Sequence, residues 1–196
     1  MTILLENPIL FDLWNRITGD ITIKKKIISD FIRPFPGAKI LDIGCGTGAF
    51  SQLIQDPSVS YIGVDLNPAY IKLAKKRKYP GLFYCEDAAT LVLPENEFDI
   101  VLALDSLHHM DDEHVRQVLS FAKKCLKPNG RFVSIEPVIT QNQPLLEKQL
   151  MKLDRGKHIR TIEANLAFFK EAFPEIHSEL LNSYFIPWTE CVFVCK

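Results

Sequence analysis

Hydrophobic residues along the chain form two alternating kinds of pattern. The run Phe98–Leu104 is almost continuously apolar, as expected of a central strand that is buried on both faces of a sheet. Shorter runs of the strand type cover residues 40–43, 59–64, 81–84 and 131–135. Between these runs, apolar residues recur at helical spacing, as they do after residue 111. The alternation predicts a doubly wound α/β sheet with helices on both faces.

The connecting segments carry their own signals. The spacing of Phe50, Leu53 and Ile54 predicts a helix after a glycine-rich turn, and Asn67-Pro68 predicts the start of a second helix that runs to Lys78. The sequence LKPNG at 126–130 predicts a turn before the strand at 131–135.

The two ends of the chain depart from this pattern. Residues 7–33 are predicted to be helical, with an apolar stripe formed by Ile27, Ile28, Phe31 and Ile32. Two closing strands are expected at 176–185 and 191–194, antiparallel to each other, after two helical patterns within 137–173. We therefore expect one domain over 1–196, with a helical leader at 1–36, a core at 37–136, an inserted helical segment at 137–173 and closing strands at 174–196.

Composition narrows the classes of protein to consider. A chain of 196 residues with 47% apolar and 24% charged residues suits one soluble domain. The net charge of −1 gives no electrostatic reason to expect nucleic acid or a membrane surface as a partner. Five scattered cysteines, without a secretory leader or a run long enough to cross a membrane, favour reduced thiols in a cytoplasmic protein.

The candidate chemistry begins at KILDIGCGTGAF, residues 39–50. Gly44 and Gly46 allow a sharp turn and let a ligand lie against bare backbone, and Gly48 allows close packing of the next element. The spacing is G-x-G-x-G and not the G-x-G-x-x-G of dinucleotide-binding proteins. Asp42 precedes the turn and suits a cationic part of a ligand, which a pyrophosphate does not offer.

The stretch LDIGCGTG resembles the first motif of the class I S-adenosylmethionine-dependent methyltransferases. The resemblance covers about residues 39–136 and implies a seven-stranded, Rossmann-like sheet whose last strand is reversed. It also implies S-adenosylmethionine as the cofactor, with S-adenosylhomocysteine as the product. The residues that we assign to cofactor binding are Asp42, Gly44, Cys45, Gly46, Thr47, Gly48, Asp65, Leu66, Asp87, Ala88 and Leu104.

Two acidic residues follow predicted strands at the edge where such folds bind ligands. Asp65 lies about 20 residues after the glycine turn, where a carboxylate accepts hydrogen bonds from ribose hydroxyls, although it could instead cap the next helix. In the resembled family, an aspartate at the place of Asp87 binds the adenine amino group, and the alternative here is a turn cap. Ala88 and Leu104 are small or apolar neighbours that suit an adenine slot.

Catalytic candidates follow the central strand. His108 or His109 could act as a general base, and Asp105 could hold the methionine part of the cofactor or orient a histidine. The histidines could also only cap a helix or line the pocket, and Glu136 is a weaker candidate base. No convincing set of metal ligands is found, so no metal is expected.

The chain lacks the N-P-P-Y or D-P-P-Y pattern that serves transfer to exocyclic or amide nitrogens. The resulting hypothesis is methyl transfer to an oxygen or carbon of a small molecule. Two alternatives are a non-catalytic S-adenosylmethionine-binding protein and a nicotinamide-dependent oxidoreductase on the same fold.

Two helical segments are candidates for covering the active site. Residues 137–173 resemble a substrate lid and carry the cationic side chains Arg155, Lys157, His158 and Arg160, which could bind an acidic substrate or simply be solvated. In the leader, Phe11 or Trp14 could contribute to a cofactor lid, with core packing as the alternative.

Overall fold

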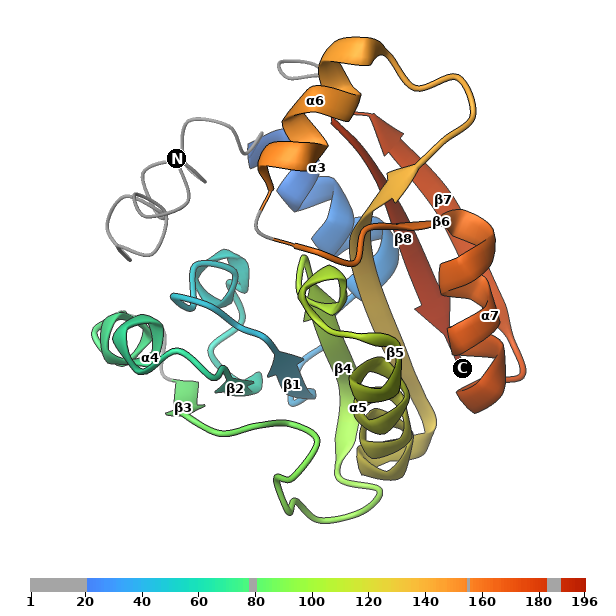
Figure 1. Cartoon of the computed structure of the whole chain (residues 1–196). Helices are drawn as coiled ribbons and strands as arrows, with labels where there is room; N and C mark the ends of the chain where they lie inside the picture. The colour runs from blue at the N-terminus through green and yellow to red at the C-terminus, as the bar shows by residue number, and fades with distance from the viewer. Residues whose placement is uncertain (1–20, 78–80, 155, 183–187) are drawn as a thin grey trace.

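A single sheet organises the chain in the computed structural model, which describes residues 21–77, 81–154, 156–182 and 188–196 (Figure 1). Its strands follow the order β3-β2-β1-β4-β5-β8-β7, and a short β6 pairs with the end of β5. The strands are β1 Lys39–Ile43, β2 Ser60–Val64, β3 Gly81–Tyr84, β4 Phe98–Leu104, β5 Leu126–Ile139, β6 Arg160–Thr161, β7 Ile176–Asn182 and β8 Thr189–Cys195.

The strand directions confirm the predicted doubly wound sheet with a reversed last strand. Pairs β3-β2, β2-β1, β1-β4 and β4-β5 are parallel, whereas β8 is antiparallel to both β5 and β7. The chain order reverses between β1 and β4, and ligands of such sheets bind beyond the carboxyl ends of the strands at this switch point.

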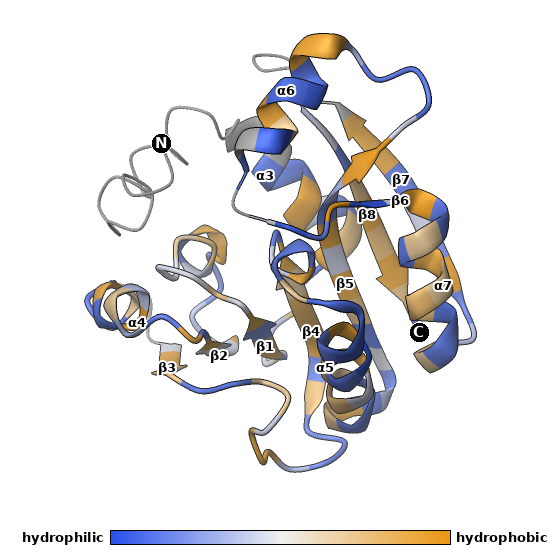
Figure 2. Cartoon of the chain, viewed as in Figure 1, coloured by the Kyte–Doolittle hydropathy of each residue, from blue (hydrophilic) through white to orange (hydrophobic). Residues whose placement is uncertain are grey.

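Helices cover both faces of the sheet because inward residues alternate along each strand. In β4, Val101 and Ala103 face a core shared with α5 and α7, and Ile100 and Leu102 face a second core with η1 and α4. Figure 2 shows the hydrophobic colour concentrated along β4 and β8. The helices are α3 Ile21–Lys26, η1 Ile27–Ile32, η2 Ser51–Leu53, α4 Pro68–Ala74, η3 Leu107–His109, α5 Asp112–Cys125, α6 Leu145–Leu153 and α7 Ile162–Ala172.

The predicted helix after the glycine turn is wrong. The segment forms only the three-residue 3-10 helix η2, and Ile54 is already extended, with ψ at 113°. Pro57 follows closely, and a proline disfavours helical geometry at the residue before it, so the short connection to β2 has no room for a helix. The next helix, α4, is likewise shorter than predicted and ends at Ala74.

The predicted turn at 126–130 is also wrong, because β5 is continuous from Leu126 to Ile139. Leu126 pairs with Phe98 and Arg131 pairs with Ile100, so the register shifts between the two pairs. The residues between Leu126 and Arg131 therefore form an irregularity inside the strand instead of a separate turn.

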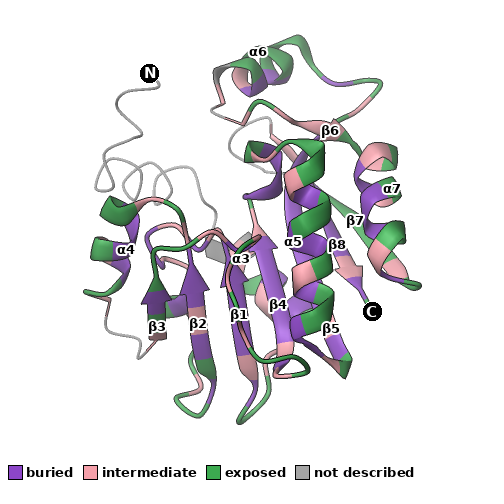
Figure 3. Ribbon diagram, turned by 60° about the horizontal axis from the view of Figure 1, so that its bottom comes forward, coloured by how far each residue is buried: buried purple, intermediate pink, exposed green. Residues whose placement is uncertain are grey.

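The segment after β5 divides into two parts. Helix α7 packs beside α5 and buries Phe168 and Phe169 in the core, so it belongs to the helix layer of the sheet. Figure 3 shows α6 apart from that layer, beyond the end of the sheet where the parallel strands finish. Whether this segment acts as a lid stays a prediction.

Several features predicted at the ends of the chain can be compared with the structure. Ile27, Phe31 and Ile32 are buried as expected, whereas Phe11 and Trp14 lie outside the described residues. All five cysteines are free thiols. Among the described residues, none of the helices combines the length and the apolar character needed to cross a membrane.

Candidate active site

A cavity of about 440 Å³ opens at the carboxyl ends of the parallel strands, next to the switch point. The residues on its wall that the sequence predicts are Gly44, Gly46, Asp65, Leu66, Asp87, Ala88, Asp105 and His109. They come from the ends of β1, β2, β3 and β4, so the order of the parallel strands brings them together.

The glycine turn forms one wall of the cavity. Gly44, Gly46 and Gly48 have φ angles of 72°, 55° and 69°, a region that favours glycine. A Cβ atom on Gly44 would lie 2.5 Å from Cβ of Ser106, which belongs to the loop after β4. Gly48 packs against Ala74 of α4 and Phe83 of β3, so its lack of a side chain lets these elements approach the turn.

Asp65 links the glycine turn to the loop after β2. Its Oδ2 accepts the Gly46 N–H at 2.9 Å, and its Oδ1 accepts the Asn67 N–H at 2.8 Å. The N-cap of α4 is Asn67, whose side chain accepts the Ala69 N–H, so Asp65 is not the cap of that helix.

Asp87 has two partners while lining the cavity. Its Oδ1 accepts the Ala89 N–H at 2.9 Å, as in a turn cap, and lies 3.3 Å from His114 Nε2. Both the capping and the cavity-lining interpretations therefore describe this residue. Since an ionised carboxylate offers about four lone-pair sites, these contacts leave acceptor capacity.

Five predicted cofactor residues lie off the cavity wall: Asp42, Cys45, Thr47, Gly48 and Leu104. Asp42 is only 2% exposed and accepts a hydrogen bond from the Tyr61 hydroxyl. Its Oδ1 is buried and has no hydrogen-bond partner within the described part of the chain. Burial raises the pKa of Asp42 to about 7, although the hydrogen bond from Tyr61 opposes this shift. A direct contact of Asp42 with a ligand in the cavity is therefore not favoured by this geometry.

Arg77 holds the glycine turn from outside. Its Nε donates to the Thr47 carbonyl oxygen at 2.9 Å, and its NH2 group donates to Thr47 Oγ1 at 3.1 Å. Arg77 follows α4, so the turn is fixed by a neighbouring element and not by a long helix of its own.

His108 lies behind the cavity wall, in a buried network. Its Nδ1 lies 2.7 Å from Glu136 Oε2, and its backbone N–H donates to the same oxygen at 3.0 Å. Glu136 Oε1 also accepts the Leu107 N–H and the Ser134 hydroxyl, which places the carboxylate under the η3 turn. Burial lowers the pKa of His108, but hydrogen bonds with Asp154 and Glu136 outweigh burial and raise the pKa to about 10. A protonated imidazole has no lone pair to accept a proton, so this geometry argues against His108 as a general base. The donors of the η3 turn, Ser134 and His108 surround the oxygens of Glu136, which argues against that residue as well.

His109 and Asp105 remain on the wall as candidates for chemistry. The His109 ring lies beside that of His108, with ring centroids 4.1 Å apart. Asp105 has a φ of 53°, an uncommon value for a residue with a side chain, and its N–H donates to the Ile135 carbonyl oxygen.

Among the cationic residues of the inserted segment, Arg160 is held by other parts of the chain. Arg160 donates to the carbonyl oxygens of Leu107 and Met110 and pairs with Asp112 at 2.7 Å. Its guanidinium therefore holds the loop after β4, while Arg155 lies outside the described residues.

Sequence analysis missed several wall residues, including Ser106, Tyr70 of α4, and Met110, Asp111 and His114 around the start of α5. These side chains reach the cavity through tertiary packing of helices, for which no local motif exists. Glu86 was also missed, although its position directly before Asp87 could have indicated it.

Comparisons with known proteins agree with the geometry. Residues 41–134 match a family described as "Methyltransferase domain". Over 151 residues the chain is 28% identical to a phosphoethanolamine N-methyltransferase of Triticum aestivum, an alignment that covers 74% of this chain and 29% of that protein. Over 100 residues it is 37% identical to a phthiotriol/phenolphthiotriol dimycocerosates methyltransferase of Mycobacterium tuberculosis, covering 49% and 36% of the two chains. The chain thus spans about a third of the length of these curated relatives.

Solved structures share the fold at low sequence identity. A phosphoethanolamine N-methyltransferase 2 of Haemonchus contortus, in complex with phosphomonomethylethanolamine and S-adenosylhomocysteine, gives a TM-score of 0.77 at 16% identity and covers 97% of this chain and 57% of that one. A SAM-dependent methyltransferase of Archaeoglobus fulgidus gives 0.74 at 20% identity, with coverage of 95% and 99%.

Proposed function

We propose that this protein is an S-adenosylmethionine-dependent methyltransferase that transfers a methyl group to an oxygen or carbon atom of a small-molecule acceptor. The match of residues 41–134 to a methyltransferase domain supports this proposal. One observation carries the proposal. A single cavity has the glycine turn, Asp65 and Asp87 on its wall together with Asp105 and His109. Side chains suited to bind a nucleoside and side chains suited to bind a methyl acceptor thus line the same cavity.

The residues of the cavity fit S-adenosylmethionine. At Gly44 and Gly46 the wall is bare backbone, against which the amino-acid end of the cofactor can lie. Asp65 lies on the cavity wall, where its carboxylate can accept hydrogen bonds from the ribose hydroxyls, and Asp87 can accept from the adenine amino group. Ala88, which is 6% exposed, adds a small apolar surface beside that base.

The chain contributes mainly position and shielding to the reaction. The bound cofactor supplies a methyl group on a sulfonium, which is already a good leaving group. The cavity wall aligns the acceptor with that carbon and excludes water. Where the acceptor is a hydroxyl, His109 takes its proton, because His108 is held in the ion-paired network with Glu136 and Asp154.

The alternatives make different predictions. A nicotinamide enzyme would need a pyrophosphate site, but the turn has G-x-G-x-G spacing. A non-catalytic protein would bind the cofactor but release no S-adenosylhomocysteine with any acceptor.

The names of the relatives suggest an acceptor panel for the test. Labelled S-adenosylmethionine is incubated separately with a quinol, with a phenol, and with phosphoethanolamine as a nitrogen acceptor. The quinol is chosen because a relative from Synechocystis is a 2-methyl-6-phytyl-1,4-hydroquinone methyltransferase. We expect S-adenosylhomocysteine release with the quinol or the phenol and not with phosphoethanolamine. Activity with the amine alone would contradict the assigned acceptor atom, and cofactor binding without turnover would favour the non-catalytic alternative.

His109→Gln tests the assigned base. We expect kcat for a hydroxyl acceptor to fall about 100-fold, the range of general-base catalysis, with little change in cofactor affinity. His177→Gln is the matched control, because His177 is exposed on β7, away from the cavity. An unchanged kcat in His109→Gln would refute the assignment.

A further inference from the structure

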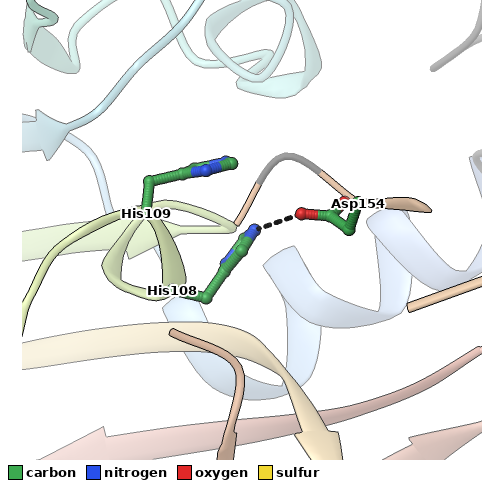
Figure 4. A group of neighbouring side chains, drawn as sticks. All are labelled: His108, His109 and Asp154. Carbon is green, nitrogen blue, oxygen red and sulfur yellow. Dashed lines mark ion pairs between the residues drawn. The ribbon is translucent and has the colours of Figure 1, made fainter. Parts of the chain in front are cut away.

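Two histidines and a carboxylate converge beside the cavity. One ligand-type atom from each of His108, His109 and Asp154 lies within 4.8 Å of the other two. Figure 4 shows His108 directed at Asp154 of the inserted segment, with the His109 ring alongside. The three residues come from two segments, and only His109 is on the cavity wall.

The distances suit a metal ion. His108 Nε2 and Asp154 Oδ1 are 3.5 Å apart. Ligand atoms bound tetrahedrally to zinc at about 2.0–2.2 Å lie about 3.3–3.6 Å from one another. Two imidazoles and one carboxylate are donors that Zn²⁺ and related divalent transition metals accept. A small movement of the His109 side chain would complete the set.

Glu136 supplies the support that metal-binding histidines usually have. Its Oε2 lies 2.7 Å from His108 Nδ1. A carboxylate at one ring nitrogen fixes the tautomer and directs the other nitrogen outward, here toward Asp154. His108 is only 5% exposed, so packing in the core fixes the orientation of its ring.

Hydrogen bonds also join the loop after β4 to the inserted segment, and these contacts need no ion. The His158 N–H donates to the His108 carbonyl oxygen at 3.0 Å, and Arg160 donates to the Met110 carbonyl oxygen at 2.9 Å. A Cβ atom on Gly156 would lie 1.9 Å from His108 Cδ2, so the glycine permits the close approach. The three donors are therefore brought together by the fold itself.

We propose that Asp154 and the two histidines bind a divalent transition-metal ion of the Zn²⁺ class, through His108 Nε2, one ring nitrogen of His109 and a carboxylate oxygen, with Glu136 as the positioning residue of His108. The ion displaces the proton on His108 Nε2, because a protonated ring nitrogen has no lone pair for a metal. The ion lies between the loop after β4 and the inserted segment, and water completes its coordination. Its binding fixes the cavity wall at His109. The site goes beyond the proposed function. A His109 that holds the ion has no free ring nitrogen for the proton of an acceptor, so metal binding and general-base action are alternative states of this residue.

The test titrates the metal-free full chain with Co²⁺, followed by its visible absorption, and with Zn²⁺ in a calorimeter. We expect one ion per chain, with Zn²⁺ displacing Co²⁺. Asp154→Asn keeps the size of the side chain but removes its charge, and it should weaken binding about tenfold or more, as should His109→Gln. His177→Gln, at an exposed histidine, should bind like the wild type.

Circular dichroism and S-adenosylhomocysteine titration of the same samples separate the possible failures. Absence of a Co²⁺ absorption band in a folded wild-type chain, or equal binding by wild type and Asp154→Asn, would overturn the metal site. If S-adenosylhomocysteine still binds in that case, the proposed function is untouched. Metal binding without S-adenosylhomocysteine binding would support the site and contradict the proposed function.

Discussion

The two halves of the cavity wall are built in different ways. On the side of β1 and β2, the contacts stay within the first two strands and the segments that follow them: Gly46 and Asp65 are 19 positions apart, and Thr47 and Arg77 are 30 apart. On the side of β4 and β5, the key contacts reach β5 and the inserted segment: His108 meets Glu136 across 28 positions, and Arg160 meets Met110 across 50. The first half follows from a motif and strand order, whereas the second depends on the inserted segment and on buried charge.

The carboxylates of the two halves show the same contrast. Glu136 is 1% exposed and is surrounded by donors, including His108 and the backbone of η3. Asp42 is 2% exposed and accepts one hydrogen bond, from Tyr61, among the contacts of the described residues. Burial is therefore compensated in the second half and much less so in the first.

The largest expected effect comes from removing the charge of Glu136. Glu136→Gln leaves the imidazolium of His108 without its close buried partner, and we expect a loss of about 3–5 kcal/mol in the free energy of unfolding. Glu97→Gln is the control, because the ion pair of Glu97 with Lys39 is exposed and contributes less than about 1 kcal/mol. Urea denaturation of both variants measures the difference, and similar losses would remove the contrast between the halves.

Asp42 should make the first half sensitive to pH. Its pKa is raised from 3.8 to about 7 in the folded chain, so the folded state binds the extra proton between these values. The contribution of Asp42 to the free energy of unfolding is then fully present below pH 3.8. It falls as the pH rises to 7, by on the order of 4 kcal/mol at about 1.4 kcal/mol per pKa unit. Asp42→Asn should lack this fall. Urea midpoints of the wild type and the variant from pH 4 to pH 8 test it, and parallel curves would contradict the assignment.

The glycine turn tests how closely the two halves meet. Gly44→Ala combines a positive φ with a clash against Ser106, and we expect a loss of about 2–4 kcal/mol in the free energy of unfolding. Gly37→Ala is a matched control, because Gly37 has a φ of +80° but no atom within 4 Å of an added Cβ. It should lose only about 1–2 kcal/mol from backbone strain. Equal melting temperatures for the two variants would show that Ser106 does not press on the turn.

The smallest of these effects concerns ligand affinity. Asp65→Ala removes two acceptor oxygens from the cavity wall, and we expect the Kd for S-adenosylhomocysteine to rise about 10-fold to 100-fold, since a hydrogen bond to a charged group contributes about 1.5–3 kcal/mol. Asp30→Ala, at an exposed residue of η1, is the control. Unchanged calorimetric affinity in Asp65→Ala would remove Asp65 from the proposed ribose site.

The difference between the halves explains what the sequence could predict. The buried run at Phe98–Leu104 and the acid after each strand are local signals, so the sheet type and the places of Asp65 and Asp87 at the cavity follow from them. The prediction of a helix after Gly48 was wrong because it used only the helical spacing of apolar residues. That spacing takes no account of Pro57, five residues beyond Gln52, which ends the segment. The burial of Asp42 depends on the facing strand, where Tyr61 stands, and no periodicity in one strand reveals that partner.

The contacts on the side of β4 and β5 could not be predicted from the sequence, for a related reason. His108 and His109 are adjacent, and nothing in their spacing shows which of them faces the cavity. Their roles separate only when Glu136 and Asp154, from distant segments, enclose His108.

The central claim is that the cavity between the glycine turn and Asp87 binds S-adenosylmethionine. Calorimetric titration of the full chain with S-adenosylhomocysteine, and separately with NADH, tests it most directly. We predict saturable binding of S-adenosylhomocysteine with one site per chain and no heat of binding with NADH. Binding of NADH without S-adenosylhomocysteine would contradict the account, as would the absence of binding by S-adenosylhomocysteine to a folded chain.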